Sequence, residues 1–202
     1  MVYGHFRYRR IHLPHHSIIH LPYITMKKIS LLISALAGVL SFAQTSPLVI
    51  QNYSAYNAEG RMRTGLPGGA SGPYMYAAPN LPYGTYTVPA GASTQYNTFS
   101  TSGTALLPIT TWYVTDPTNP ANNGAYAYNH PFISSVMNVT NVWAGFHFFL
   151  KDPVTGNGTD TYQIGDPTVD PWFTSSATGT YSSADWFTIT TPSGPTTYLQ
   201  IF

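Results

Sequence analysis

The stretch VWAGFHFFLK, residues 142–151, predicts a ten-residue β-strand and decides the class of the fold. Successive side chains of a strand point to opposite faces, so alternate residues share one face. The face predicted to lie against the core is wholly apolar and contains Val142, Ala144, Phe146, Phe148 and Leu150. The opposite face contains Trp143, Gly145, His147, Phe149 and Lys151. Because this second face is also aromatic, we expect it to be covered by another element or to serve as a binding surface.

Short runs of β-forming residues, separated by Gly, Pro, Asn and Asp, continue on both sides of this strand. No helical period of apolar residues interrupts them. Strands are predicted at residues 48–54, 56–63, 85–88, 94–100, 109–114, 134–138, 142–151, 159–164, 185–191 and 197–202, with a Pro- and Gly-rich loop at 64–84. The pattern predicts an all-β fold, specifically a single antiparallel β-sandwich of the jelly-roll or Ig-like type spanning residues 44–202.

The last two predicted strands allow a prediction of register. Phe187 and Ile189 share one face of their strand, and Leu199 lies on an apolar face of the next. Pairing Ile189 with Leu199 joins the two apolar faces and leaves residues 192–196 as the loop. Trp186 and Tyr198 then point outward.

A secretory signal peptide is predicted at residues 26–43, where two lysines precede an apolar run and small residues end it. The run is shorter than the roughly 20 apolar residues that span a bilayer, so we expect cleavage between Ala43 and Gln44 rather than a membrane anchor. Residues 1–25 are then an upstream extension or the result of a mis-assigned start, and they are absent from the mature protein. Their four clustered histidines leave with them, and the protein is expected to be periplasmic or extracellular.

The composition of the mature chain excludes several functions. The formal net charge of the whole sequence is +1, but residues 44–202 keep only Arg61, Arg63 and Lys151 against all seven acidic residues. Three cations cannot neutralise a run of phosphates, so nucleic-acid binding is not expected. The absence of cysteine excludes disulfides, thiolate metal sites and a cysteine nucleophile. No built-in cofactor is expected.

Glycoside hydrolysis uses a pair of carboxylates, so the acidic residues are candidates for that chemistry. Four of the six aspartates precede proline, a dipeptide that starts turns. The remaining carboxylates define one alternative function, a small secreted hydrolase using Glu59 with Asp160 or Asp185. Turn and surface roles are the competing interpretation of the same residues.

Oxygen ligands in two neighbouring predicted loops suggest a structural calcium site, because calcium prefers hard oxygen ligands from flexible loops. The candidate ligands are Asp152, Asn157, Asp160, Asp166 and Asp170. Their spacing fits no EF-hand loop, and the same residue types are ordinary turn formers.

The mature chain holds more aromatic side chains than one core is expected to hide. Flat rings near hydroxyl and amide groups can stack on sugars and bond their hydroxyls. The candidate ligand-binding residues are Trp143, His147, Phe149, Trp186, Tyr198, Tyr74 and Tyr76. The sequence thus predicts a secreted, non-catalytic binding or surface-structural module whose partner is a glycan or another cell-surface component. Two alternatives stay open: the rings pack as β-formers, or the protein self-associates through edge strands as a matrix component.

Overall fold

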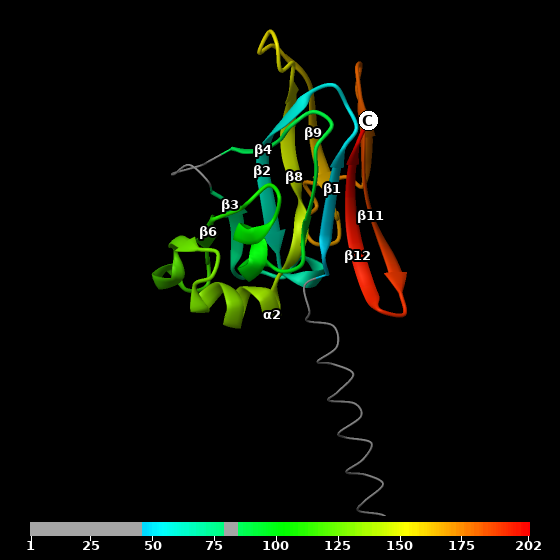
Figure 1. The fold of residues 1–202 in the computed structure, drawn as a ribbon. Helices are drawn as coiled ribbons and strands as arrows, with labels where there is room; N and C mark the ends of the chain where they lie inside the picture. Colours follow the sequence, from blue (N-terminus) through cyan, green and yellow to red (C-terminus); the bar gives the residue numbers. More distant parts are fainter. Residues whose placement is uncertain (1–45, 79–84) are drawn as a thin grey trace, which may run out of the picture. The chain divides into compact units, whose positions relative to one another are not determined.

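The computed structural model describes residues 46–78 and 85–202 (Figure 1). The predicted upstream extension at 1–25 and the predicted signal peptide at 26–43 lie outside the described residues. The described part is an all-β fold of two sheets rich in antiparallel pairs, as the sequence predicted. Among the described residues, no helix is long and apolar enough to cross a membrane.

The five-stranded sheet has the order β10-β11-β12-β1-β5. Its strands are β1 (Leu48–Asn52), β5 (Ser93–Tyr96), β10 (Ser176–Thr178), β11 (Ser183–Thr191) and β12 (Gly194–Ile201). The first strand runs parallel to the last, and the other pairs are antiparallel.

The seven-stranded sheet has the order β7-β6-β3-β2-β8-β9. The seventh strand, β4, pairs with residues 58–60 of β2, whereas β3 pairs with β2 at Arg63. Its strands are β2 (Asn57–Gly65), β3 (Tyr74–Ala77), β4 (Tyr86–Val88), β6 (Thr111–Thr115), β7 (Gly124–Ala127), β8 (Val142–Lys151) and β9 (Gly158–Gly165). The helical segments are short: η1 (Pro67–Gly69), η2 (Phe99–Thr104), η3 (Pro120–Asn122), η4 (Ile133–Met137) and α2 (Asn138–Thr140).

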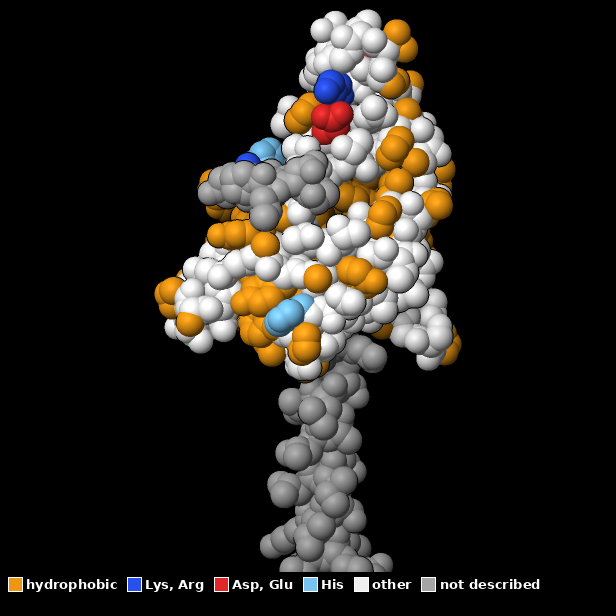
Figure 2. All heavy atoms as spheres, turned by 60° about the vertical axis from the view of Figure 1, so that its left-hand side comes forward, with side chains coloured by type: hydrophobic (Ala, Val, Ile, Leu, Met, Phe, Trp, Pro, Cys, Tyr) orange, Lys and Arg blue, Asp and Glu red, His pale blue; other side chains and the backbone are white. Residues whose placement is uncertain are grey.

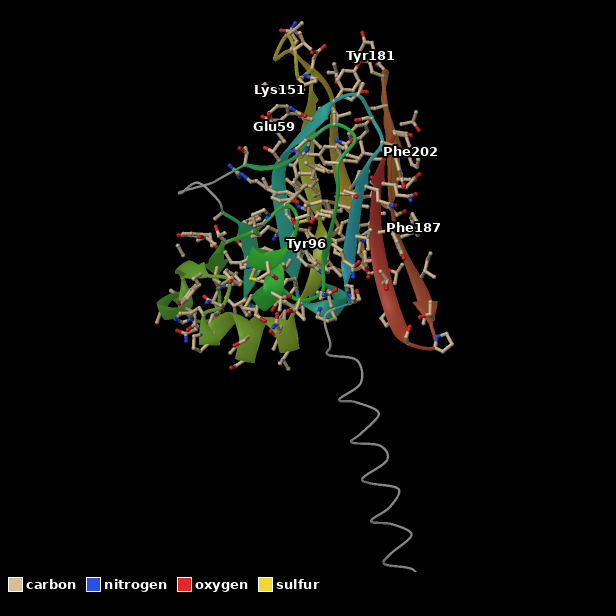
Figure 3. The ribbon with its side chains drawn as sticks, viewed as in Figure 1. Glu59, Tyr96, Lys151, Tyr181, Phe187 and Phe202 are labelled. Atoms are coloured by element: carbon tan, nitrogen blue, oxygen red, sulfur yellow. The ribbon has the colours of Figure 1, made fainter. Side chains whose placement is uncertain are left out.

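One hydrophobic core joins the inner faces of the two sheets, and aromatic rings form its centre. Tyr96 on β5 is labelled in Figure 3. Its ring lies 5.6 Å from that of Trp143 on β8 and 6.3 Å from that of Tyr86 on β4. The hydroxyls of Tyr86 and Tyr96 bond one another, which satisfies polar groups deep in the core. Burial raises the pKa of Tyr86, so its hydroxyl stays neutral.

The strand predicted at 142–151 is confirmed as β8, but the face assigned to Trp143 is wrong. Arg63 of β2 lies opposite Gly145, whereas the next residue, Thr64, lies opposite Trp143. Ala144 is therefore the extra residue of a β-bulge, which exchanges the two faces of the strand at this point. Trp143 consequently points into the core and is 3% exposed, while Phe146 stays on the core face as predicted.

The register predicted for the last hairpin is also wrong. Trp186, not Ile189, lies opposite Leu199, and Thr191 lies opposite Gly194. The loop therefore has two residues instead of five, and Gly194, directly after it, has a positive φ of 118°, a conformation that favours glycine. This register places Trp186 in the core at 6% exposure and turns Ile189 outward at 47% exposure.

Two segments differ in type from the prediction. Residues 134–138 were predicted as a strand but belong to the helical segments η4 and α2. Ile133 and Met137, four residues apart, lie on one side of this turn and are fully buried, so the burial pattern there has a helical period. The loop predicted at 64–84 contains β3, and β7 and β10 were not predicted.

Candidate ligand-binding groove

A groove of about 270 Å³ lies on the seven-stranded sheet, on the face turned away from the core. We call it the outer groove. It is lined by Arg61, Arg63, Tyr76, His147, Gln163, Trp172 and Phe173. Five of these residues come from neighbouring strands, and the other two come from the loop after β9.

The floor of the outer groove is a row of three hydrogen-bonding side chains across three strands. Arg61 of β2 lies opposite His147 of β8, which in turn lies opposite Gln163 of β9. All three side chains are exposed, because their sequence neighbours are the buried residues of the alternating pattern. Adjacent strands are roughly 4.8 Å apart, so the row presents polar groups at regular intervals.

Two glycines make room for one wall of the groove. Gly145 of β8 lies opposite Gly165 of β9, and the ring of Phe173 packs over both. A Cβ atom on Gly145 would lie 2.8 Å from the ring, and one on Gly165 would lie 2.9 Å from it. The absence of both side chains therefore lets the loop of residues 166–173 lie directly on the sheet.

Backbone hydrogen bonds hold this loop in place. The amide of Asp166 donates to the carbonyl of Ala144 at 2.8 Å, and the amide of Thr174 donates to the carbonyl of Gln163 at 3.0 Å. Within the loop, the amide of Phe173 donates to the carbonyl of Asp170 at 3.0 Å. The loop is thus a fixed wall of the groove.

Arg63 is held from three sides at the end of the groove. It forms an ion pair with Asp170, and its guanidinium lies 4.6 Å from the ring centre of Tyr74 and 5.6 Å from that of Tyr76. Burial raises the pKa of Tyr76, although the positive charge of Arg63 opposes the shift. The Tyr76 hydroxyl therefore stays neutral at physiological pH and can donate or accept a hydrogen bond.

Trp172 is the most exposed large aromatic ring of the groove, with 74% of its surface accessible. Its backbone amide donates to Oδ1 of Asp170 at 3.1 Å, which fixes the main chain beneath the exposed indole. A tryptophan is usually among the more buried side chains, so an exposed indole beside the polar side chains of a groove is a candidate ligand contact.

The structure brings three of the seven predicted ligand-binding residues to this end of the sheet. Tyr76 and His147 line the outer groove, and Tyr74 packs edge-on against Tyr76 at a ring distance of 5.6 Å. Phe149 lies on the same face of β8, opposite Glu59, but does not line the groove. Five residues that line the groove were not among the predicted ones: Arg61, Arg63, Gln163, Trp172 and Phe173.

The other three predicted residues lie elsewhere. Trp143 and Trp186 are in the core, so the expectation that their rings are exposed is wrong. Tyr198 lies on the outer face of the five-stranded sheet, where its ring stacks on Phe187 at 5.3 Å with an interplanar angle of 11°. It therefore belongs to a different surface from the outer groove.

The five predicted calcium ligands do not gather in one place. Asp160 and Asp166 lie at opposite ends of β9, about 20 Å apart along an extended strand. No group of three or more His, Asp or Glu side chains that could hold a metal occurs in residues 46–78 and 85–202. A calcium site that also uses Asn157 or backbone oxygens stays a prediction.

These acidic side chains instead stabilise turns. Oδ1 of Asp152 accepts the amides of Val154 and Thr155 at 2.7 and 2.9 Å, and these bonds lower the pKa of Asp152. Burial would raise the pKa of Asp160, but hydrogen bonds led by the amide of Tyr181 outweigh it and lower that pKa. Oδ1 of Asp166 accepts the amide of Thr168 at 2.8 Å.

The carboxylates considered for hydrolysis are separated by the fold. Glu59 is on the outer face of the seven-stranded sheet and pairs with Lys151 at 3.6 Å (Figure 3). Asp185 is on β11 of the other sheet, between the buried residues Ala184 and Trp186, and so points away from the core. The carboxylate of Asp160 accepts hydrogen bonds from the amides of Thr180 and Tyr181 and from the hydroxyl of Ser182, in the turn before β11. None of the three lines the outer groove.

The fold and the groove define a β-rich protein with an aromatic core and a polar and aromatic surface groove. No protein-family model, no curated protein and no solved structure matches the chain.

Proposed function

We propose that this protein is a non-catalytic glycan-binding module and that the outer groove is its binding site. The observation that carries the proposal is the 74% exposed indole of Trp172 at the rim of a groove whose floor is a row of hydrogen-bonding side chains. A sugar ring has an apolar face for stacking on an indole and hydroxyls for polar partners, so it matches both parts of the groove.

The arrangement of the polar groups supports a glycan rather than a purely apolar ligand. Arg61 and Gln163 supply several N–H donors, Gln163 adds a carbonyl acceptor, and His147 can donate or accept. The backbone of these residues is held by strand pairing, so a ligand needs to order only their side chains.

Replacing Trp172 with alanine is expected to weaken polysaccharide binding about tenfold or more, because stacked aromatic anchors carry much of the binding energy in such sites. Affinity electrophoresis of the mature protein against a panel of neutral and acidic polysaccharides measures the effect. Tyr181→Ala is the matched control, since Tyr181 is 65% exposed but does not line the groove (Figure 3). Equal retention of both variants and the unaltered protein, or no retention by any polysaccharide, would refute the proposal.

We also propose that the protein is exported and acts outside the cytoplasm as a single β-sandwich. The two sheets with a shared core support the sandwich assignment, while the choice between a jelly-roll and an Ig-like topology stays a prediction. Protein recovered outside the cytoplasm of a bacterial host is expected to begin at Gln44. Intact-mass measurement with peptide mapping tests this, and a secreted product that retains residues 1–25 would contradict it.

A surface-structural role is the second candidate, favoured by the apolar outer face of the five-stranded sheet. Phe187 is 37% exposed, Ile189 47% and Phe202 46%. Phe187 and Phe202 are labelled in Figure 3. Charged side chains are also few on the face drawn in Figure 2, so charge gives little protection against association. Light scattering over a range of concentrations separates the candidates, because a strictly monomeric protein excludes self-association.

A further inference from the structure

Strand β11 has an open edge along its second half. On the side away from β12, β10 pairs with residues 183–185, and the amide of Trp186 donates to the carbonyl of Ser175 at 2.7 Å. Before Ser175 the chain lies along the other sheet, because the amide of Thr174 donates to a carbonyl of β9 at 3.0 Å. The part of the chain that the structure describes therefore places no strand beside residues 187–191 on that side. Figure 1 shows the hairpin of β11 and β12 at the margin of the five-stranded sheet.

The backbone groups that face this open edge belong to Thr188 and Thr190. Ser183 and Phe202 exchange two backbone hydrogen bonds, at 3.1 and 2.8 Å, so every second residue of β11 from Ser183 onward bonds to β12. The residues between them face the opposite side, as the bond of the Trp186 amide on that side confirms. The N–H and C=O groups of Thr188 and Thr190 thus form a row of donors and acceptors along an exposed stretch of strand.

This edge lacks the features that usually keep edge strands from pairing. Natural proteins protect such edges with lysine or other charged residues, with proline, or with a bulge that twists the strand away. Residues 186–191 read WFTITT and contain neither a charged residue nor a proline. Their pairing with β12 continues without a bulge as far as Thr191. The second half of β11 is therefore a template for a further strand.

We infer that two copies of this protein pair antiparallel along the open edge of β11, about a two-fold axis at Ile189. In this register Thr188 of each copy lies opposite Thr190 of the other, and each such pair exchanges both of its backbone hydrogen bonds. Ile189, which is 47% exposed, lies opposite Ile189 of the other copy, so an apolar contact forms at the axis. A second copy fits this edge because the sequence on both sides of Ile189 is self-complementary in hydrogen bonding and carries no charge.

The inference rests on the second candidate function, self-association, and specifies its strand, its partner and its register. An interface of this isologous kind is closed, so it produces dimers rather than open fibres. The outer groove lies on the other sheet, so each dimer carries two such grooves. A polysaccharide bound at both grooves would be held more tightly than at one, through effective concentration.

Sedimentation velocity of the mature protein over a range of concentrations is expected to show a reversible equilibrium between monomer and dimer. Ile189→Lys is expected to weaken dimerisation about tenfold or more, because it removes the apolar contact and places two like charges opposite one another. Ile189→Glu is expected to have the same effect. A mixture of these two variants is expected to dimerise again, because opposite charges then face each other across the axis.

Thr190→Pro tests the backbone bonds without a change of charge. Proline is tolerated in a strand where its missing N–H faces an open edge, so this variant is expected to keep its fold, as judged by circular dichroism, and to dimerise less. Val154→Lys is the matched control for the added charge, because Val154 is 91% exposed in the turn between β8 and β9. It is expected to dimerise like the unaltered protein.

Unchanged dimerisation of Ile189→Lys, or no recovery in the mixture with Ile189→Glu, would overturn the inference. An equal loss in Val154→Lys would show a general effect of charge and would overturn it as well. Loss of association in Phe202→Lys but not in Ile189→Lys would mean that the copies meet through the apolar outer face, which leaves self-association standing without the edge pairing. A protein that stays monomeric at every concentration would overturn both.

Discussion

Replacing Trp143 with alanine is expected to lower the free energy of unfolding by about 3–5 kcal/mol, the usual loss for a large buried aromatic ring. The ring contacts those of Phe99 at 4.7 Å, Tyr96 at 5.6 Å and Trp112 at 5.9 Å, so its removal leaves a cavity at the centre of the aromatic cluster. Its Nε1 also donates to the carbonyl of Ser46 at 3.0 Å, and that acceptor would lose its partner.

Urea denaturation followed by circular dichroism measures this loss. Should Trp143→Ala fail to fold, Trp143→Phe keeps most of the ring and is expected to cost less because the cavity is smaller. Trp172→Ala is the control, since removal of a 74% exposed indole is expected to change stability by no more than about 0.5 kcal/mol. A loss below 1 kcal/mol for Trp143→Ala would contradict the core position of this side chain.

The class of the fold could be predicted because it depends on local patterns. Strand β8 alternates between buried and more exposed residues from Phe146 to Lys151, and short β-forming runs bounded by turn residues repeat along the chain. The bulge at Ala144 could not be predicted, because a bulge is set by pairing with β2 and leaves no mark in the alternation of residue types. One extra residue was enough to move Trp143 from the expected binding surface into the core.

The hairpin between β11 and β12 shows a second limit. Both possible registers join apolar residues to apolar residues, so the pattern alone does not decide between a five-residue and a two-residue loop. The burial of Trp186 against the core decides it, and that burial depends on the opposing sheet. Register thus follows from tertiary packing in this hairpin.

Part of the candidate site was predictable. Tyr74, Tyr76 and His147 were predicted because aromatic rings with hydrogen-bonding groups suit ligand binding. Arg61 and Arg63 could also have been predicted as a pair. They are two of the three Lys and Arg residues of the mature chain, and because they lie two residues apart they share one face of their strand. Trp172 lies in a loop after an Asp-Pro turn, and sequence alone does not show that this loop folds over β8 and β9. Its position depends on the pair Gly145 and Gly165, which come from different strands.

Replacing Gly165 with alanine is expected to cost about 3 kcal/mol of stability and to remove glycan binding. The new Cβ would overlap the carbonyl oxygen of Ala144, lie 2.5 Å from Cα of Gly145 and lie 2.9 Å from the ring of Phe173. Two of these neighbours are backbone atoms of the paired strand and cannot rotate away. Relief requires β9 to separate from β8, which breaks the bond from the Asp166 amide to the Ala144 carbonyl and displaces the loop that carries Trp172.

Gly158→Ala, on the same strand, is the matched control for this prediction. A Cβ there would meet its nearest atom, the carbonyl oxygen of Leu150, at 3.9 Å, which is an ordinary contact. Because alanine also restricts the unfolded chain, this variant is expected to be neutral or more stable by up to about 1 kcal/mol and to keep its binding. Urea denaturation and affinity electrophoresis of both variants give the comparison. Equal stability and equal binding would mean that the loop of residues 166–173 does not depend on the glycine pair, and the wall of the outer groove would then need a different physical origin.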